Sequence, residues 1–466
     1  PPQTGRPPAA RPHPPLPEEP VGVRDPLPPI YRPQVRAADC PNVVVILIDT
    51  LRSDRLGCYG DKRETSPALD HLAAQGVRFE NVLSQCTWTR PSIGSMMTSR
   101  YPRELGLYVE QEQILAPEFK TWPELMKDAG YRTIGLTANP NINASFNFHQ
   151  GYDLYVDSDV LFYWMPVQAG QTVRGVTALP GAPDLFEKAL SLVNETGNEG
   201  PYFLYFNVME AHEWASLRPG TSMLRREYAN LFEPVDDYTH YVQLIRQVTD
   251  DIGVFVDRLT ELPGWEDTIF VFVSDHGEGL NDHPNVGLSM NHGFTVYESV
   301  SRVPWIIYRK GWEPKQHVIT QEVRLLDVMP TVLDMIGAAG PPGAQGVSML
   351  PVIEGESNLA VLPRYEVIET QFQGTDKVAV YGKRFKYIEN RVPQEGMPSR
   401  ELQPRGGHEN GSATSVIAKY PEVTGALKDY LTGWESRIPR RPPTAPIRKI
   451  TQQQLDQLES IGYLAN

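Results

Sequence analysis

Residues 42–49, NVVVILID, decide the fold of this chain. After Asn42 they form an unbroken run of β-branched and aliphatic side chains that is closed by one carboxylate. Because the run lacks the polar alternation of a half-exposed strand, it predicts a strand buried on both faces, as in the parallel sheet of an α/β protein. Ligands bind beyond the carboxyl ends of such strands, so Asp49 is the first candidate site residue.

Apolar runs and helical stretches alternate along the following sequence. A helix is predicted at Thr65–Gln75, with Ser66 as its N-cap and Pro67 at its first position. A short strand is expected at Val77–Val82. Further strands are expected at 133–136, 202–208, 269–273 and 303–308, and further helices at 122–129, 184–193, 241–259 and 326–336. This alternation predicts a three-layer α/β/α sandwich with a mostly parallel central sheet.

Composition divides the chain into three parts. Residues 1–38 hold thirteen of the 43 prolines, which favours extended segments and a tether, or else a stretch lying on its own domain. Residues 39–353 carry the alternating pattern, and 354–466 are expected to form a smaller C-terminal α+β domain. The evidence for that smaller domain is short strands at 378–380 and 385–388, a Gly-rich stretch at 406–412, a linker at 437–446 and a closing helix at 451–461.

Charge and cysteine content exclude several classes of protein. Lys and Arg total 43 against 57 Asp and Glu, a net charge of −14, which argues against a non-specific nucleic-acid binder. The three cysteines, Cys40, Cys58 and Cys86, exclude a disulfide framework and a zinc site built on paired cysteines. No apolar run is long enough to predict a membrane-spanning helix. Because the chain begins with Pro1 rather than Met, we expect a processed or trimmed form.

Polar residues follow two of the predicted buried strands. Asp49 closes the first strand, and Asp275 and His276 follow the run IFVFVS. Two carboxylates and an imidazole at neighbouring strand ends predict a divalent-metal site, although a lone aspartate at a strand end is often a helix cap. Mixed oxygen and nitrogen ligands suit Mn²⁺ or Zn²⁺ better than Ca²⁺, and Ca²⁺ and Mg²⁺ stay open.

Thr89 lies just before a further helical stretch, within TWTRPSIGSMMTSRYP at residues 87–102. A threonine there can cap the helix. It can also act as a nucleophile, because a hydroxyl beside a divalent metal loses its proton more easily and the amides of a helix start favour an anionic substrate.

Four segments occur in a recognisable order, and they are NVVVILIDTLRSDRLGCYG from residue 42, TRPSIGSMMTSRYP from residue 89, VFVSDHGEGL from residue 271 and NHGFTVYESVSRVPWII from residue 291. Together they resemble the sulfatase family of the alkaline-phosphatase superfamily over about residues 40–466. The resemblance implies an alkaline-phosphatase-like fold and a hydrolase. It also implies that Thr89 is the nucleophile and that the metal ligands are Asp49, Thr89, Asp275 and His276.

The nucleophile position departs from the family pattern. The family carries Cys or Ser there and converts it to formylglycine, a route that Thr89 cannot enter. Cys86 lies three residues out of step, with Trp88 where a proline belongs, and Ile93 replaces the family's arginine. An unmodified threonine instead resembles superfamily members that cleave or transfer phosphoryl groups.

The sulfate-binding positions depart as well. Thr50 replaces the second aspartate of the usual pair, and LTANPNI at residues 136–142 lacks the family's lysine and histidine. His212 matches a substrate-binding histidine, and His292 matches a lysine or histidine that faces the ester. A structural role is the alternative for both histidines.

Four nearby polar residues have two interpretations each. Glu278 and His283 follow the SDHGE turn and belong either to the site or to a solvated loop. Arg52 and Asp54 either orient Asp49 or form a surface ion pair, and the ion pair is favoured.

The sequence therefore predicts a metal-dependent hydrolase of sulfuric or phosphoric esters. In this prediction Thr89 attacks in line to give a covalent threonyl intermediate, and His292 stabilises charge on the equatorial oxygens. A phosphodiester or phosphonate ester is chemically favoured. The alternatives are a sulfuric ester hydrolase without formylglycine, a phosphoryl-group transferase and a non-catalytic binding protein. The expected partner is a small anionic ester, without nucleic acid. The expected location is periplasmic or otherwise extracytoplasmic, with the N-terminal segment as an optional membrane tether, and the oligomeric state is open.

Overall fold

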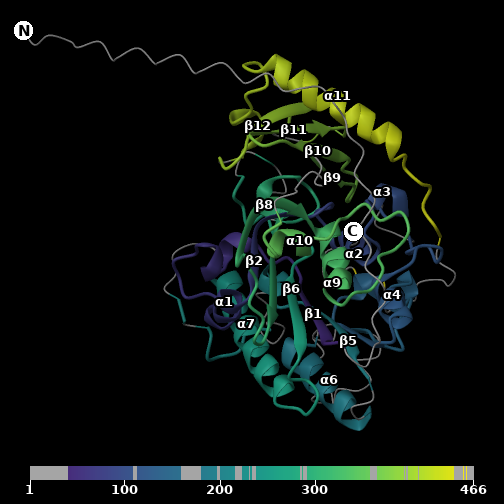
Figure 1. Ribbon diagram of the computed structural model, residues 1–466. Coiled ribbons are helices and arrows are strands. Elements are labelled where there is room, and N and C mark those ends of the chain that lie inside the picture. The colour runs from purple at the N-terminus through teal and green to yellow at the C-terminus, as the bar shows by residue number, and fades with distance from the viewer. Residues whose placement is uncertain are drawn as a thin grey trace, which may run out of the picture.

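Two β-sheets organise the part of the chain that the computed structural model describes (Figure 1). The described residues are 40–108, 113–158, 180–196, 200–215, 223–229, 231–232, 238–283, 286, 291–356, 365–392, 394, 397–407, 409–445, 455 and 458. The predicted tether at 1–38 and most of the predicted closing helix at 451–461 lie outside them.

The larger sheet has eight strands within the described residues, in the order β4-β3-β5-β1-β6-β7-β2-β8. At its centre β1 (Asn42–Ile48) pairs in parallel with β5 (Tyr202–Val208) and β6 (Thr268–Val273). β7 (Arg302–Arg309) runs antiparallel to both of its neighbours. On one side of the sheet, β3 (Arg132–Thr137) pairs in parallel with β5 and with β4 (Leu154–Val156). On the other side, β2 (Val77–Leu83) pairs in parallel with the edge strand β8 (Val318–Arg324). The sheet is therefore mostly parallel, as predicted.

Helices cover both faces of this sheet (Figure 1). Alternate residues of β1 point to opposite sides, and all seven are buried, which explains the missing polar alternation in the sequence. On one side, Val43, Val45 and Leu47 pack against α2 (Thr89–Thr98), α4 (Trp122–Asp128) and α9 (Val328–Met335). On the other side, Val44, Ile46 and Ile48 pack against α1 (Pro67–Gln75), α6 (Ala182–Thr196) and α7 (Thr239–Thr260). These two cores confirm the three-layer α/β/α sandwich.

The second sheet is antiparallel and lies toward the C-terminal end of the chain. Its order is β12-β11-β10-β9, and its strands are β9 (Glu366–Thr370), β10 (Lys377–Tyr381), β11 (Phe385–Asn390) and β12 (Arg400–Pro404). Helix α11 (Pro421–Arg437) covers one face of this sheet, and the other face packs on the larger part through Leu83, Val296 and Tyr297. The domain boundary at 353 stays a prediction; α10 (Leu350–Ile353) ends there.

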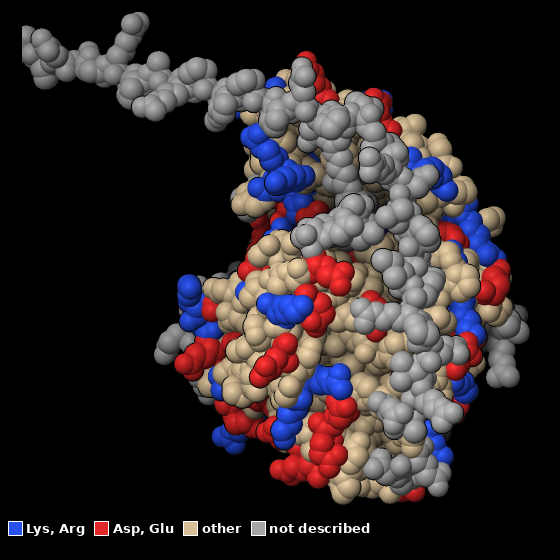
Figure 2. Space-filling view, viewed as in Figure 1, with Lys and Arg blue, Asp and Glu red and all other residues tan. Residues whose placement is uncertain are grey.

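Short helical turns complete the described residues. They are η2 (Ser53–Arg55), η3 (Gly57–Tyr59), α3 (Pro102–Leu105), η4 (Pro140–Ile142), η5 (Ala144–Phe146), η6 (His212–Ala215), α8 (Glu298–Ser301), η7 (Leu325–Asp327) and η8 (Gly411–Ala413). No helix among the described residues is both long and apolar enough to cross a bilayer. On the face seen in Figure 2, acidic and basic side chains are interspersed.

The structure adds elements that the sequence did not predict. Among the strands these are β4, β8, β9 and β12, and among the helices longer than one turn α11 is the unpredicted one within the described residues. The segment predicted as a linker at 437–446 does not begin as one, because Arg437 is the last residue of α11. The residues after it are hydrogen-bonded to the domain of the larger sheet. The Arg441 amide donates to the Arg103 carbonyl at 2.8 Å, and the Ile114 amide donates to the Thr444 carbonyl at 3.1 Å.

Candidate active site

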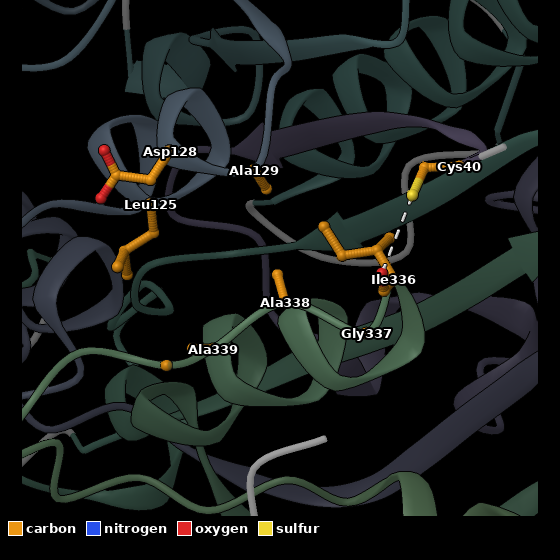
Figure 3. A pocket seen from close by; sticks show the side chains of 9 residues that line it. Cys40, Leu125, Asp128, Ala129, Ile336, Gly337, Ala338 and Ala339 are labelled. Carbon is orange, nitrogen blue, oxygen red and sulfur yellow. Dashed lines mark hydrogen bonds between the residues drawn. The ribbon is translucent and has the colours of Figure 1, made fainter. Parts of the chain in front are cut away.

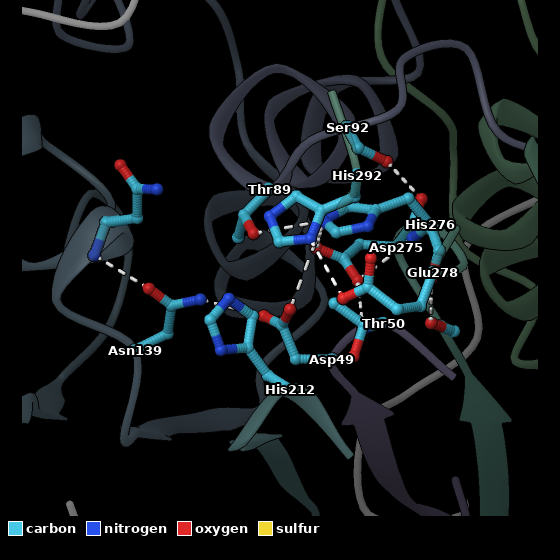
Figure 4. A network of polar contacts seen from close by, with 12 residues as sticks. Asp49, Thr50, Thr89, Ser92, Asn139, His212, Asp275, His276, Glu278 and His292 are labelled. Carbon is cyan, nitrogen blue, oxygen red and sulfur yellow. Dashed lines mark hydrogen bonds and ion pairs between the residues drawn. The ribbon is translucent and has the colours of Figure 1, made fainter. Parts of the chain in front are cut away.

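The carboxyl ends of β1 and β6 bring three predicted metal ligands together. Leu47 and Val273 are paired in register, so Asp49 and Asp275 leave the sheet side by side. The candidate ligand atoms of Asp49, Asp275 and His276 all lie within 4.8 Å of one another, and all three side chains are fully buried (Figure 4). We refer to these three residues as the triad.

Two carboxylate oxygens of the triad lack hydrogen-bond donors. Asp49 Oδ1 and Asp275 Oδ2 are buried and accept no hydrogen bond from any described residue. They lie 4.0 and 3.3 Å from His276 Nε2. Buried anionic oxygens without partners are costly unless a cation or a proton neutralises them. The donor set therefore fits a divalent cation that accepts oxygen and imidazole ligands.

His276 is held in the tautomer that a metal ligand needs. Its Nδ1 donates to the Gly277 carbonyl at 2.9 Å, so the ring proton is on Nδ1 and Nε2 carries a lone pair. Burial and the neighbouring His292 lower the pKa of His276 to about 3, which keeps the ring neutral. Nε2 and Asp275 Oδ2 are therefore two lone-pair atoms facing each other, an arrangement that a bound cation relieves.

Burial also raises the pKa values of both carboxyls. For Asp49, burial is the largest cause, and the charge of Asp275 adds to it. For Asp275, burial raises the pKa to about 6, although the amides of His276 and Thr50 donate to its Oδ1 at 3.0 and 3.3 Å. Without a cation, the fold therefore favours a proton at the triad.

Thr89 is the first residue of α2, and its hydroxyl faces the triad. Thr89 Oγ1 lies 3.2 Å from His276 Nε2 and donates to that lone pair (Figure 4). Ser92, on the same helix, donates to the Asp275 carbonyl at 2.6 Å and so ties α2 to β6. Helix α2 thus directs both its N-terminal amides and the Thr89 hydroxyl toward the predicted metal site.

His212 and His292 lie next to the triad. The ring centroids of His292 and His276 are 4.5 Å apart, and those of His292 and His212 are 5.2 Å apart. Each imidazole has a carboxylate at its Nδ1, namely Glu213 for His212 and Glu278 for His292, both at 3.2 Å. We call these two residues the site histidines.

Glu278 connects His292 to the turn that carries His212. Its Oε2 accepts from His292 Nδ1 and also from Trp214 Nε1, at 3.2 Å in each case, and Trp214 belongs to the same turn, η6, as His212. Burial alone would raise the pKa of Glu278, but the charge and hydrogen bond of His292 lower it. The solvated-loop interpretation of Glu278 is therefore wrong.

Other predicted residues lie outside the cluster. His283 contacts the Glu409 carbonyl and the Ser299 hydroxyl, so it connects the larger part to the C-terminal part. Arg52 binds Asp54 through two hydrogen bonds of 2.9 and 2.8 Å rather than binding Asp49. The Arg52 side chain is buried but that of Asp54 is 57% exposed, so this is an ion pair at the surface, as predicted. Cys86 is buried before α2 begins, and burial raises the pKa of its thiol.

A small cavity of about 140 Å³ lies at the opposite end of β1 (Figure 3). Cys40, Leu125, Asp128 and residues 336–340 contribute to its walls. Cys40 precedes β1 and Asp49 follows it, so the seven-residue strand places this cavity about 23 Å from the triad. The cavity is therefore separate from the candidate active site.

A profile of the family described as Sulfatase matches residues 41–338, more than half of the chain, and the match includes the triad, Thr89 and both site histidines. This chain belongs to the sulfatase family. The family is one of hydrolases, which confirms the resemblance drawn from the four sequence segments.

Two sequence relatives and one solved structure are similar to this chain. N-acetylgalactosamine-6-sulfatase from the dog, Canis lupus familiaris, is 27% identical over 368 residues, which cover 68% of this chain and 66% of the relative. Delta 4,5-hexuronate-2-O-sulfatase from Bacteroides thetaiotaomicron is 22% identical over 446 residues, which cover 85% of this chain and 90% of that relative. The phosphonate monoester hydrolase of Agrobacterium radiobacter shares the fold with a TM-score of 0.69 at 17% identity, covering 85% and 96%. The match to the dog relative thus spans just under two thirds of that protein.

The structure shows what occupies the positions where this sulfatase-family chain departs from the pattern. Ile93 is fully buried in the apolar core. Thr50 has a φ of 57°, a conformation that is costly for a β-branched residue. Asn139 donates to Asp49 Oδ2 at 2.7 Å, and Asn207 donates to the same oxygen at 3.3 Å. Neither amide was predicted as a site residue, although each lies near the end of a predicted buried strand, where site residues are expected.

Proposed function

We propose that this chain is a metal-dependent hydrolase of sulfuric or phosphoric esters in which Thr89 is the nucleophile. The observation that carries the proposal is the 3.2 Å contact between Thr89 Oγ1 and His276 Nε2, a ligand atom of the triad. The triad would hold the cation. A divalent cation there supplies Lewis-acid chemistry, which lowers the pKa of a neighbouring hydroxyl and polarises the ester.

The chain's own residues account for the remaining steps. Thr89 Oγ1, after losing its proton to solvent, forms a bond to sulfur or phosphorus while the bond to the ester oxygen breaks. Burial disfavours the charge of His212, but the hydrogen bond to Glu213 and the charge of Asp49 raise its pKa to about 9, so it can give the leaving oxygen a proton. The α2 amides and His292 stabilise charge on the equatorial oxygens. Water then cleaves the threonyl ester.

Threonine at position 89 favours a phosphodiester or phosphonate ester as the substrate, since formylglycine chemistry is closed to it. The similarity in fold to a phosphonate monoester hydrolase agrees with this preference. Sulfuric ester hydrolysis without formylglycine is the second candidate, because the curated relatives named above are sulfatases. We also place the protein outside the cytoplasm, acting on a small anionic ester, as the sequence resemblance implies.

The deciding experiment compares rates on an aryl sulfate, a phosphate monoester, a phosphodiester and a phosphonate ester, using protein stripped of metal and reloaded with Mn²⁺ or Zn²⁺. We expect the phosphodiester or phosphonate ester to be turned over fastest and Thr89→Ala to lose turnover while it keeps its metal content and melting temperature. Unchanged turnover in Thr89→Ala contradicts the nucleophile assignment. A strong preference for the aryl sulfate contradicts the preferred substrate class.

A further inference from the structure

One carboxylate oxygen of Asp49 is occupied by two amides, and the other is not. Oδ2 accepts from Asn139 at 2.7 Å and from Asn207 at 3.3 Å, whereas Oδ1 accepts nothing from the described residues. Asn139 follows β3 and Asn207 lies in β5, so the amides reach Asp49 from two separate elements. Both asparagines are fully buried, where an amide donor needs an acceptor.

We propose that Asn139 is a positioning residue that makes Asp49 a one-oxygen metal ligand and thereby selects small divalent cations over Ca²⁺. A carboxylate with Oδ2 hydrogen-bonded to two amides offers only Oδ1 to a cation. Ca²⁺ gains from two-oxygen carboxylates and a high ligand number, whereas Mn²⁺ and Zn²⁺ are held well by one oxygen from each carboxylate together with imidazole nitrogen.

Asn139 is itself braced from the start of α2. Its Oδ1 accepts from the Asn141 amide at 2.8 Å. Arg90 then donates to Asn141 twice, from Nη2 to Oδ1 at 2.7 Å and from Nε to the carbonyl at 3.0 Å. The Arg90 guanidinium lies 3.6 Å from the centre of the Phe146 ring and is buried. These contacts fix Asn139 from the residue that follows Thr89, so one chain of contacts spans the nucleophile helix and the metal ligand.

Asn139 and Asn141, which make these contacts, lie in the segment where a sulfatase of the usual pattern carries a lysine and a histidine for the sulfate group. In this chain that segment supports the metal ligand instead. Groups that orient a ligand from behind typically change metal affinity by about 10–100-fold when they are removed. The effect should therefore be measurable without any substrate.

The test is calorimetric titration of Mn²⁺, and separately of Ca²⁺, into the metal-stripped full chain. We expect Asn139→Leu to weaken Mn²⁺ binding by about 10–100-fold and Ca²⁺ binding by less, so that the preference for Mn²⁺ narrows. Asn139→Ala is the second variant, because it removes the donor without adding bulk if Asn139→Leu fails to fold. Asn143→Leu is the matched control, since Asn143 is equally buried, lies four residues away and binds Ser158 rather than Asp49.

The inference rests on the proposed function only in taking the triad as a cation site. Folded Asn139 variants that keep wild-type Mn²⁺ affinity overturn it, as does an equal loss for Mn²⁺ and Ca²⁺, or an equal loss in Asn143→Leu. If the wild-type chain binds none of these cations, the triad assignment and the proposed function fail together. If the wild type binds Mn²⁺ and hydrolyses no ester, only the proposed function fails.

Discussion

Glu278 Oε2 lies 3.2 Å from Nδ1 of His292. Because an ionised carboxylate can only accept, this contact places a proton on Nδ1 and leaves Nε2 as the ring atom available to the site. The same oxygen accepts from Trp214, so one buried side chain fixes His292 directly and the His212 turn indirectly. The positions of His292 and of the turn that carries His212 therefore depend on Glu278, while Glu213 contacts His212 separately.

Replacing Glu278 tests that dependence. We expect Glu278→Gln to lower kcat by about 10–100-fold with little change in KM, because the amide can donate where the carboxylate accepted and so disturbs the orientation of the His292 ring. Glu278→Asp should recover part of the loss. Glu401→Gln, which changes an equally buried carboxylate in the second sheet, serves as the control. A proportional loss of kcat and folded fraction in all three variants would indicate a purely structural role.

Substitutions that separate hydroxyl chemistry from side-chain shape test Thr89. Thr89→Val keeps the branched volume at a fully buried position and removes only the hydroxyl. We expect it to lose turnover, whereas Thr89→Ser should stay within about tenfold of wild type, because serine supplies the same nucleophilic oxygen. Steady-state rates on the preferred ester measure both effects. Comparable activity in the valine and serine variants is incompatible with nucleophilic attack by Thr89.

The triad should make metal-free protein sensitive to pH. Burial raises the pKa of Asp275 from 3.8 to about 6, so its protonated form is favoured in the fold. The contribution of Asp275 to the free energy of unfolding is fully present below pH 3.8 and is lost as the pH rises through 6. The total loss is about 2–3 kcal/mol. In the absence of metal, Asp275→Asn should remove that loss and be more stable than wild type at pH 7.

Urea unfolding at pH 4 and pH 7, with and without Mn²⁺, checks the prediction for Asp275. Added Mn²⁺ should stabilise the wild type and not the variant, because a cation that binds only the folded state shifts the equilibrium by mass action. Equal stability of the metal-free proteins at pH 7 contradicts the account.

A second pH effect should come from Lys377 in β10. The side chain is fully buried and donates to Asn390 Oδ1 and Met397 Sδ, and burial lowers its pKa from 10.5 to about 8. Its stability contribution is present above pH 10.5 and is lost as the pH falls through 8. Lys377→Met should therefore be more stable than wild type at pH 7 by about 2–3 kcal/mol, with the difference shrinking toward pH 10.5. A difference that does not change between pH 7 and pH 10 contradicts this assignment.

The central sheet was predictable because burial on both faces leaves a direct mark on sequence. β1 has no polar position after Asn42, and the carboxylates of the triad come directly after β1 and shortly after β6. α11 was not predicted, because only Leu427, Leu431 and Trp434 of its seventeen residues are buried and the rest are mostly polar. The edge strand β8 was missed for a similar reason, since its residues alternate weakly between exposed and buried.

The candidate site was only partly predictable from sequence. The triad and Thr89 lie in recognisable segments, and the structure brings them together. Asn139 and Asn207 carry only their positions near strand ends as a local signal, because their importance comes from the contacts that both amides make with Asp49 from separate elements. Glu278 was left open because nothing near it in the sequence indicates that Trp214 and His292 converge on it.

The strand order of the large sheet also matters during synthesis. β1 lies between β5 and β6, and the contact from the Thr50 amide to Asp275 spans 225 residues. At about 5–20 residues per second, a ribosome needs roughly 10–50 s to supply β6 after β1 has emerged. For that time NVVVILI has no strand to pair with on its β6 side, so this apolar segment of the nascent chain lacks its complete set of partners and is a natural place for a chaperone to bind.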